Sequence, residues 1–230
     1  MSEVKIIGVT QPVHISDMTP NDLIAYTARV SNPSNQNNKA TASKLLRYLI
    51  RENHWSPFEM VSVTMEIKTT RDISRQILRH RSFSFQEFSQ RYADPTTDLQ
   101  QPFVAREARL QDYDNRQASV SLDGENSNHI MIQNKWIGVQ DKVVEEAQKA
   151  YEWAIDNGIA KEQARVVLPE GNMSTTLYMA GTLRSWIHYC ELRRGNGTQL
   201  EHMQVADQCW DTISELFPDV ALALAPEDNS

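Results

Sequence analysis

The segment VSVTMEIKTTRDISRQILRHR, residues 61–81, contains a change of hydrophobic period that indicates the fold class. In its first half, apolar and polar residues alternate from Val61 to Lys68, which is typical of a half-buried β-strand. After Thr70, a residue that can cap a helix, apolar residues recur at the helical spacing of Ile73 and Ile77. A strand followed directly by a helix predicts a mixed α/β chain.

The rest of the chain predicts further strands and helices in irregular alternation. The polar stretch from Asp94 to Asn128 shows little periodicity, and we expect a surface excursion there. Because the chain has no internal repeat and no linker, we predict a single α+β domain over residues 1–230, with helices packed on a largely antiparallel sheet. The remaining strands are expected over residues 4–9 and 174–182, and the remaining helices over 20–30, 39–51, 130–155, 163–168, 185–193 and 198–217.

The composition excludes several classes of protein. Of the 230 residues, 40% are hydrophobic and 23% are charged, as in ordinary globular proteins, and no apolar run reaches the roughly 18 residues of a membrane span. The 23 basic and 30 acidic residues give a net charge of −7, which disfavours general nucleic-acid binding. Because two cysteines cannot form a disulfide framework and the N-terminus lacks the pattern of a secretory leader, we expect a cytoplasmic protein.

The densest chemistry lies between Arg71 and Arg91, where five arginines face only two acidic residues. Arg71, Arg75 and Arg79 are spaced so that one helix would carry them on one face. Arginine suits the binding of phosphate, because its guanidinium donates two hydrogen bonds at once. A solvated basic face paired with surface acids is the alternative. The neighbouring His80, hydroxyl and aromatic residues favour a nucleotide phosphate site.

The run Arg79-His80-Arg81, followed by Ser84, Ser89 and Arg91, resembles the signature of the flavin-dependent thymidylate synthases. Four other segments are similar to motifs of the same family, so the resemblance covers most of the chain. They are ARVS at 28–31, HWSPFE at 54–59, QARVVLP at 163–169 and the LRS…LR pair within 183–193. Three positions differ from the family's pattern or vary within it. The family's commonest residue is absent at Gln86 and at Thr182, and His188 stands at a position where the family varies.

The resemblance implies a reaction and a set of contacts. The family converts dUMP to dTMP, with methylenetetrahydrofolate as carbon donor, FAD as hydride carrier and NADPH as reductant, in a homotetramer whose sites are shared between subunits. By resemblance, the flavin contacts fall on Ser31, Ser56, Arg79, His80, Arg81, Glu87, Thr182, Leu183, Arg184 and His188. The dUMP contacts fall on Gln76, Ile77, Leu78, Arg79, Glu87, Phe88, Ser89, Gln90, Arg91, Arg165 and Arg193.

Catalysis in this family uses no cysteine nucleophile, and the resemblance assigns Arg193 to polarise the uracil. We accordingly expect Cys190 and Cys209, which lie in predicted helices, to be small buried thiols. Arg184 and Arg193 are nine residues apart, about half a revolution out of phase on a continuous helix. They would then serve different sites, as subunit sharing permits.

Two other functions stay open beside this one. One is a flavin-dependent enzyme that modifies a pyrimidine nucleotide to a different product. The other is a nucleotide-binding regulator without turnover. The histidine and acidic residues follow no zinc-binding spacing, and we predict no metal.

Overall fold

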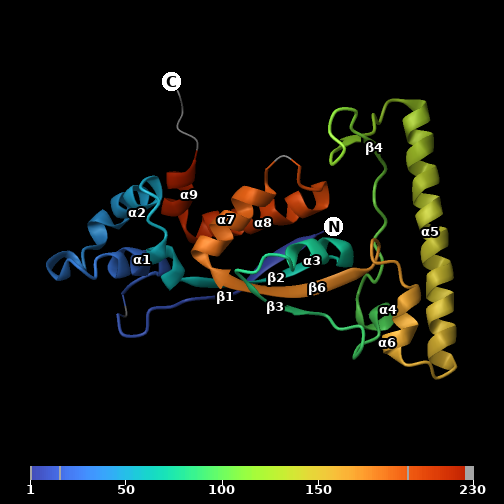
Figure 1. Ribbon diagram of the computed structural model, residues 1–230, viewed down its shortest axis with the longest axis horizontal. Coiled ribbons are helices and arrows are strands. Elements are labelled where there is room, and N and C mark those ends of the chain that lie inside the picture. The colour runs from blue at the N-terminus through green and yellow to red at the C-terminus, as the bar shows by residue number, and fades with distance from the viewer. Residues whose placement is uncertain (1, 16, 196, 226–230) are drawn as a thin grey trace.

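The computed structural model describes residues 2–15, 17–195 and 197–225, and its centre is a four-stranded antiparallel sheet (Figure 1). The two central strands pair along their whole length, from Ser62 opposite Thr182 to Thr70 opposite Ser174. This sheet confirms the predicted antiparallel arrangement. Its strand order is β1 (Glu3–Val9), β2 (Ser62–Thr70), β6 (Ser174–Thr182) and β3 (Ser84–Glu87).

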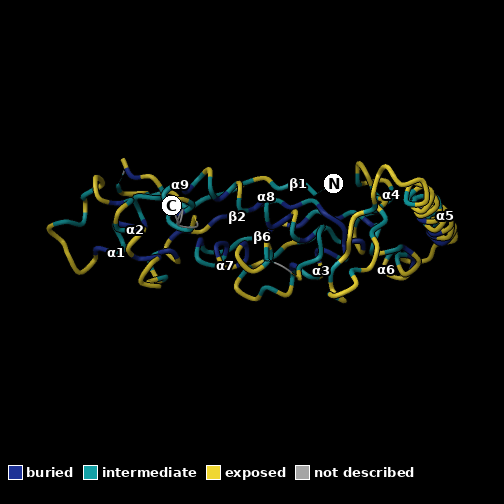
Figure 2. The backbone as a smooth tube through the Cα atoms, turned by 90° about the horizontal axis from the view of Figure 1, so that it is seen from above, coloured by how far each residue is buried: buried dark blue, intermediate teal, exposed yellow. Residues whose placement is uncertain are grey.

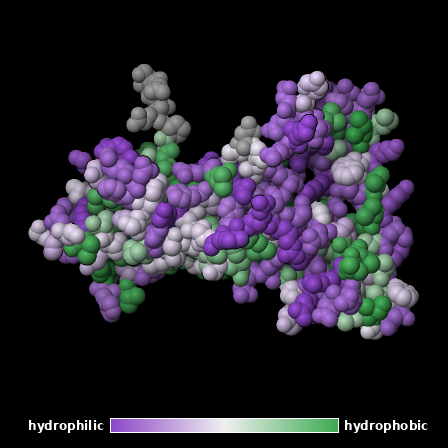
Figure 3. Space-filling view, viewed as in Figure 1, coloured by the Kyte–Doolittle hydropathy of each residue, from purple (hydrophilic) through white to green (hydrophobic). Residues whose placement is uncertain are grey.

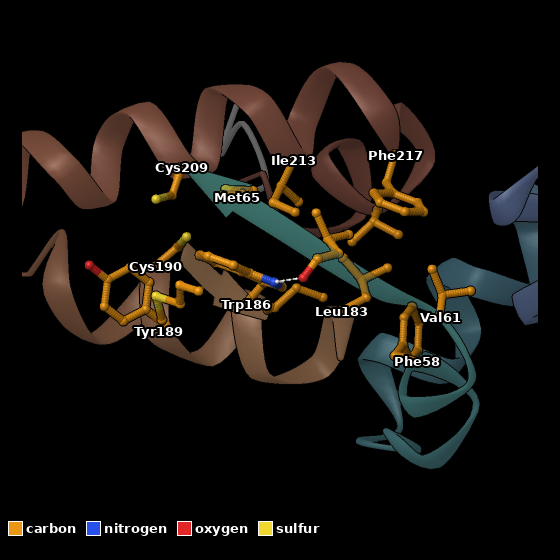
Figure 4. Close-up of a cluster of buried hydrophobic side chains, with 14 of the residues drawn as sticks. Phe58, Val61, Met65, Leu183, Trp186, Tyr189, Cys190, Cys209, Ile213 and Phe217 are labelled. Atoms are coloured by element: carbon orange, nitrogen blue, oxygen red, sulfur yellow. Dashed lines mark hydrogen bonds between the residues drawn. The ribbon is translucent and has the colours of Figure 1, made fainter. Parts of the chain in front are cut away.

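One face of the sheet holds the main hydrophobic core. Val63, Met65 and Ile67 of β2 are fully buried there, as their alternation predicts. Helices α7 (Leu183–Arg193) and α8 (Leu200–Leu216) cover this face. The Trp186 indole Nε1 donates a 3.0 Å hydrogen bond to the backbone oxygen of Val63, so α7 is fixed to the sheet by a polar contact as well as by packing (Figure 4).

Three helices cluster at one end of the sheet: α1 (Pro20–Ala28), α2 (Ala42–Arg51) and α9 (Pro218–Leu224) (Figure 1). Thr19 and Asp22 form a reciprocal capping box at the start of α1. Single turns of 3₁₀ helix connect the remaining segments, at Pro33–Asn35, Lys39–Thr41, Ser56–Met60 and Arg165–Val167.

The long helix α5 (Ser127–Asp156) stands at the opposite end of the molecule, where much of its surface is exposed (Figure 2). A second, smaller core holds it, built around Tyr151, Leu168 and Met173. The short elements around α5 are α4 (Pro95–Asp98), the hairpin of β4 (Arg109–Gln111) and β5 (Ser119–Ser121), and α6 (Lys161–Ala164). None of the helices in the described part of the chain is long and apolar enough to cross a membrane.

Some expected elements differ from those observed. The predicted excursion at 94–128 contains α4 and the β4–β5 hairpin, and β3 and α9 were not predicted. Helix α3 (Arg71–Ile77) ends before Arg79, so the predicted three-arginine face is wrong beyond Arg75. Thr70 does occupy the N-cap position of α3, but its hydroxyl donates to the Asp72 carboxylate at 2.6 Å instead of capping the backbone.

Candidate active site

The loop Arg79-His80-Arg81 is held against the sheet by the ring of Phe83. This ring lies over Gly181, where an added Cβ would come within 2.4 Å of it. It also meets Trp186 of α7 edge-on, at a centroid distance of 4.9 Å. Because only glycine leaves this space, Gly181 sets the position of the loop relative to the start of α7.

His80 and Arg193 meet at the other end of α7. The Arg193 Nε donates to His80 Nε2 at 2.9 Å, so that ring nitrogen must be unprotonated. Burial, followed by the nearby charges of Arg193 and Arg79, lowers the pKa of His80. A neutral His80 therefore accepts this hydrogen bond and orients the Arg193 guanidinium without adding a second positive charge.

A buried histidine lies behind this pair. His202 of α8 is fully buried, with its Nε2 3.1 Å from the Tyr189 hydroxyl and its Nδ1 3.3 Å from Gln76 Oε1. Tyr189 in turn packs edge-on against His80, with centroids 4.9 Å apart. Burial is the main cause that lowers the pKa of His202 to about 3, with smaller contributions from Arg193 and His80. His202 thus stays neutral and links a predicted substrate residue, Gln76, to the His80–Arg193 pair.

The same network reaches the β4–β5 hairpin. Gln76 Nε2 donates to Gln199 Oε1 at 2.8 Å, and Gln199 Nε2 donates to Glu201 Oε2 at 2.9 Å. Arg109 of β4 donates to the other Glu201 oxygen at 2.6 Å. The excursion that showed no motif in the sequence is therefore tied to the site by a charged hydrogen bond.

The predicted flavin residues near the start of α7 form a polar surface. The Arg184 guanidinium pairs with the Glu59 carboxylate, and His188 packs edge-on against Trp55 at 5.1 Å. Thr182 caps α7, because its hydroxyl accepts from the backbone N–H of Ser185 at 3.3 Å. Ser56 is exposed in the 56–60 turn, and Ser31 follows α1, the helix that packs against this turn.

Two other predicted substrate residues, Gln90 and Arg165, line a cavity of about 420 Å³ between the start of α3 and the α6 segment, called here the anion cavity. Its lining residues are Arg71, Arg75, Gln90, Glu162, Gln163, Arg165, Val166, Leu168, Glu170 and Met173. Beside it, Glu87 accepts hydrogen bonds from the Ser74 and Thr175 hydroxyls at 2.9 and 3.0 Å. Arg91 forms a 3.2 Å ion pair with Glu162 of the cavity wall.

The predicted residues therefore fall into separate groups within one chain. Gln90 and Arg165 line the anion cavity, whereas Arg193, His80 and Gln76 interact at the α7–α8 side. Helix α7 runs unbroken from Leu183 to Arg193, so Arg184 and Arg193 project in different directions from its two ends. In place of a shared contact, Arg184 pairs with Glu59 and Arg193 with His80.

Both cysteines are buried in the main core and are free thiols (Figure 4). Burial raises the pKa of Cys190 to about 12, and burial also raises the pKa of Cys209 well above its usual value. A nucleophilic cysteine needs a thiolate in an accessible, electropositive setting. The geometry confirms the reading of both cysteines as core residues.

The sequence analysis did not single out three residues that the structure places at the site. Glu59 lay inside a quoted segment, but its pairing with Arg184 cannot be read from composition. Tyr189 and His202 follow the apolar spacing of predicted helices, and such spacing indicates core packing without a polar role.

Comparison with known proteins places the chain in a family. Residues 14–219 match the family model described as thymidylate synthase complementing protein. The chain is 48% identical over 220 residues to a probable flavin-dependent thymidylate synthase of Paramecium bursaria Chlorella virus 1, covering 96% of this chain and 97% of the viral protein. It is 46% identical over 226 residues to a flavin-dependent thymidylate synthase of Synechocystis sp., covering 96% and 99% of the two chains.

A solved structure shares the fold. The UMP/dUMP methylase PolB from Streptomyces cacaoi, bound with 5-Br dUMP, superimposes with a TM-score of 0.78 at 25% sequence identity, over 97% of this chain and 94% of that one. Sequence, family model and fold agree over nearly the whole length. The chain belongs to the family of flavin-dependent thymidylate synthases.

Proposed function

We propose that this chain converts dUMP to dTMP by flavin-dependent reductive methylation, with methylenetetrahydrofolate as carbon donor and NADPH as reductant. The observation that carries the proposal is the Arg193–His80 hydrogen bond of 2.9 Å, because it fixes a cation beside the Arg79-His80-Arg81 loop. The identities of 48% and 46% to flavin-dependent thymidylate synthases support the same reaction. The buried thiols of Cys190 and Cys209 support a route without a cysteine nucleophile.

The residues present fit FAD. Within the described residues, the exposed guanidiniums of Arg79 and Arg81 have no carboxylate within salt-bridge distance, so both are available to a pyrophosphate. Ser56, Thr182 and the exposed His188 add polar contacts on the same side. When bound, FAD supplies the hydride that completes the methyl group. The full proposed set is Ser31, Ser56, Arg79, His80, Arg81, Glu87, Thr182, Leu183, Arg184 and His188.

The chain's own residues would bind and polarise dUMP. Methylation at C5 requires an electron-rich pyrimidine, and a fixed guanidinium beside N3 and its neighbouring oxygens stabilises the negative charge that develops there. His80 Nε2 accepts from Arg193 Nε, which leaves the other guanidinium nitrogens for the pyrimidine. The other proposed contacts are Gln76, Ile77, Leu78, Arg79, Glu87, Phe88, Ser89, Gln90, Arg91 and Arg165.

The separation of the two groups within one chain supports an assembly with shared sites, and we infer a homotetramer. The exposed face of α5 supplies a surface for such contacts, and Figure 3 shows hydrophobic residues gathered along this helix. Ile132, Trp136, Val139 and Val143 are all at least 40% exposed and follow the alternating spacing of four and three residues that packs helices together. A cytoplasmic location fits the two free cysteines.

The test is a product assay by mass spectrometry. Purified protein is incubated without oxygen with dUMP, methylenetetrahydrofolate and NADPH, with and without added FAD. We expect dTMP to form only when flavin is present. A flavin-loaded protein that makes no methylated nucleotide would refute the proposal.

A second substrate is favoured by one comparison. The similar solved structure is described as a methylase of both UMP and dUMP. The same assay with UMP in place of dUMP separates the two substrates. If UMP is methylated at the same rate as dUMP, the protein is a uridylate methylase that accepts both nucleotides and not a thymidylate synthase alone.

A further inference from the structure

A chain of side-chain hydrogen bonds runs from the core to the first turn of α8. The Tyr189 hydroxyl lies 3.1 Å from His202 Nε2, and His202 Nδ1 lies 3.3 Å from Gln76 Oε1. Gln76 Nε2 donates to Gln199 Oε1 at 2.8 Å, and Gln199 Nε2 donates to Glu201 Oε2 at 2.9 Å. Because each side chain bonds to the next, the orientation of one member fixes that of its neighbour.

The Glu201 end of this hydrogen-bond chain can only accept. A carboxylate has no proton to donate, so Gln199 must turn its amide nitrogen toward it. The Gln199 oxygen then faces Gln76, which must in turn present its own nitrogen. The Gln76 oxygen is left facing His202, and Nδ1 of this ring therefore carries the proton.

The other members of the hydrogen-bond chain adapt to this direction. A hydroxyl can donate or accept, an amide can turn over, and a neutral imidazole has two tautomers. Burial raises the pKa of Tyr189 well above its usual value, so its hydroxyl keeps the proton and donates to His202 Nε2. The orientation of the Gln76 amide therefore depends on Glu201, the ionised member of the chain.

Glu201 is kept ionised and in place by its neighbours. Its side chain is 22% exposed, and the Arg109 Nη2 of β4 donates to its Oε1 at 2.6 Å. Burial alone would raise the pKa of the Glu201 carboxyl, but hydrogen bonds from its own backbone N–H, Gln199 and Arg109 outweigh burial and lower it. The Arg109 Nε donates to the Ser119 hydroxyl of β5 at 2.9 Å, so the β4–β5 hairpin holds this guanidinium against Glu201.

The direction of the hydrogen-bond chain determines what Gln76 offers to a ligand. The amide uses one N–H on Gln199 and one oxygen lone pair on His202, which leaves one N–H and one lone pair. Gln76 is partly exposed near the end of α3, just before the Arg79-His80-Arg81 loop. If the amide turned over, the remaining donor and acceptor would exchange places. A pyrimidine, which has both carbonyl oxygens and an N–H, would distinguish the two orientations.

We propose that Glu201 is a positioning residue: its carboxylate, held by Arg109, turns the Gln76 amide to the orientation that binds the pyrimidine of the nucleotide substrate. This inference rests on the proposed function for the contact between Gln76 and dUMP. It also gives the β4–β5 hairpin, through Arg109, a role in substrate binding.

The variant Glu201→Gln should reverse the hydrogen-bond chain. The Arg109 guanidinium has only donors, so it would hold the oxygen of the substituted amide and leave the amide nitrogen facing Gln199. Gln199 and then Gln76 would have to turn over. His202 would in turn carry its proton on Nε2 instead of Nδ1.

Solid-state NMR of the flavin-loaded protein, with isotope-labelled histidine nitrogens, measures the His202 tautomer. The spectrum of His202→Gln identifies the signals of this ring. We expect the Nδ1–H tautomer in the wild type and the Nε2–H tautomer in Glu201→Gln. Glu215→Gln, which removes the same charge from an exposed position of α8, should keep the wild-type tautomer. The same tautomer in the wild type and in Glu201→Gln would overturn the proposal.

Calorimetry with dUMP tests whether Glu201 acts through Gln76. Glu201→Gln is expected to weaken dUMP binding by about threefold or more, because a donor and an acceptor exchange places. Gln76→Leu should weaken binding by about tenfold, and adding Glu201→Gln to it should cause no further loss. Losses that multiply in the double variant, as a purely structural role predicts, would overturn the proposal. Binding of dUMP to Glu201→Gln as tight as to the wild type would do the same.

Gln199→Met keeps the proposal testable if Glu201→Gln does not fold. This change preserves the approximate volume of the side chain but breaks the hydrogen-bond chain between Glu201 and Gln76. Because the direction is then no longer imposed on Gln76, dUMP binding should again weaken, whereas Glu215→Gln should bind dUMP like the wild type. Wild-type affinity in Gln199→Met would count against the role of Glu201.

Tautomer, binding and turnover together separate this inference from the proposed function. A reversed His202 tautomer and weaker dUMP binding in Glu201→Gln, for a protein that forms no dTMP, would refute the proposed function and support the role of Glu201. Formation of dTMP with an unchanged tautomer and an unchanged dUMP affinity in this variant would refute the role of Glu201 alone. A wild-type protein that binds no dUMP would refute both.

Discussion

Arg193 is the residue on which the proposed chemistry depends most. Its neighbour Arg194 points elsewhere, to an ion pair with Asp207 at 2.8 Å, so two adjacent arginines have different roles. Arg193→Ala should lower the rate of dTMP formation by about 100-fold or more, since a preorganised charge is lost. Flavin binding, followed by absorbance, should persist.

Arg194→Ala is the matched control, because it removes the same side chain one position along the chain. It should retain most of the activity and lose at most about 1 kcal/mol of stability with its exposed ion pair. Equal losses of activity in the two variants would remove Arg193 from the mechanism.

Gly181 affects the site because it has no side chain to fill the space that the Phe83 ring occupies. Because an added Cβ would lie 2.4 Å from Phe83, Gly181→Ala must displace that ring and the Arg79-His80-Arg81 loop behind it. We expect a loss of about 1–3 kcal/mol in the free energy of unfolding, as for other overpacked sites, together with weaker flavin binding. Urea unfolding and a flavin titration measure the two effects.

Gly138 in α5 is the control, since nothing lies within 4 Å of a Cβ there. Gly138→Ala should be neutral or stabilising by up to about 1 kcal/mol, because alanine favours a helix. Wild-type behaviour of Gly181→Ala would mean that Phe83 does not hold the loop.

At the scale of elements, the sequence predicted what local patterns encode. The strand 174–182 is confirmed at both ends, and α5 is confirmed within three residues, because apolar periodicity and the Asn157-Gly158 stop are local signals. The edge strand β3 and the β4–β5 hairpin were missed, since three or four residues with mostly exposed side chains carry no periodic pattern. Helix α9 begins with Pro218, a recognisable start that the sequence analysis passed over.

The candidate site also divides into a part that local sequence motifs predict and a part that they do not. The motifs marked the Arg79–Arg81 loop and both arginines of α7, whereas the contacts that separate Arg184 from Arg193 arise only when distant segments meet. The buried His202 and Arg71 are polar residues inside the fold, and their partners come from other elements. Tertiary partners of this kind leave no trace in spacing.

Helix α8 should make stability depend on pH through His202. Its pKa of about 3 in the fold lies below the ordinary value of 6.5, so the unfolded chain binds the extra proton between these values. The stability from neutral His202 is thus fully present above pH 6.5 and is lost as the pH falls toward 3. From pH 6.5 to 5 the loss should reach about 1–2 kcal/mol.

The measurement is urea unfolding at pH 7 and pH 5 for the wild type and for His202→Gln, which keeps a polar side chain without a titrating ring. The variant should lose less stability between the two pH values than the wild type does. Identical losses in both proteins would show that His202 is not the group that titrates.

At the scale of the whole molecule, the exposed seam of α5 should determine assembly. Val139 and Val143 lie in its middle and are 44% and 51% exposed. Val139→Glu combined with Val143→Glu should reduce the mass measured by light scattering, because buried, unpaired carboxylates are costly at an interface. The rate of dTMP formation should fall together with the mass, because the proposed active sites contain residues of several chains.

Asn134→Glu combined with Gln148→Glu adds the same charges to α5 away from this seam. These changes should leave the mass unaltered. A seam variant that keeps the wild-type mass would place the subunit contacts elsewhere.

The pairing of Ser62 with Thr182 and of Thr70 with Ser174 has a consequence for how the protein is made. On the ribosome, β2 emerges well before β6, and at about 5–20 residues per second the wait lasts many seconds. During that time β2 can pair only with β1, which comes from the start of the chain, and its other edge has no partner strand. A nascent chain that has not reached residue 174 therefore offers an incomplete sheet to chaperones, and the central pairing closes only near the end of translation.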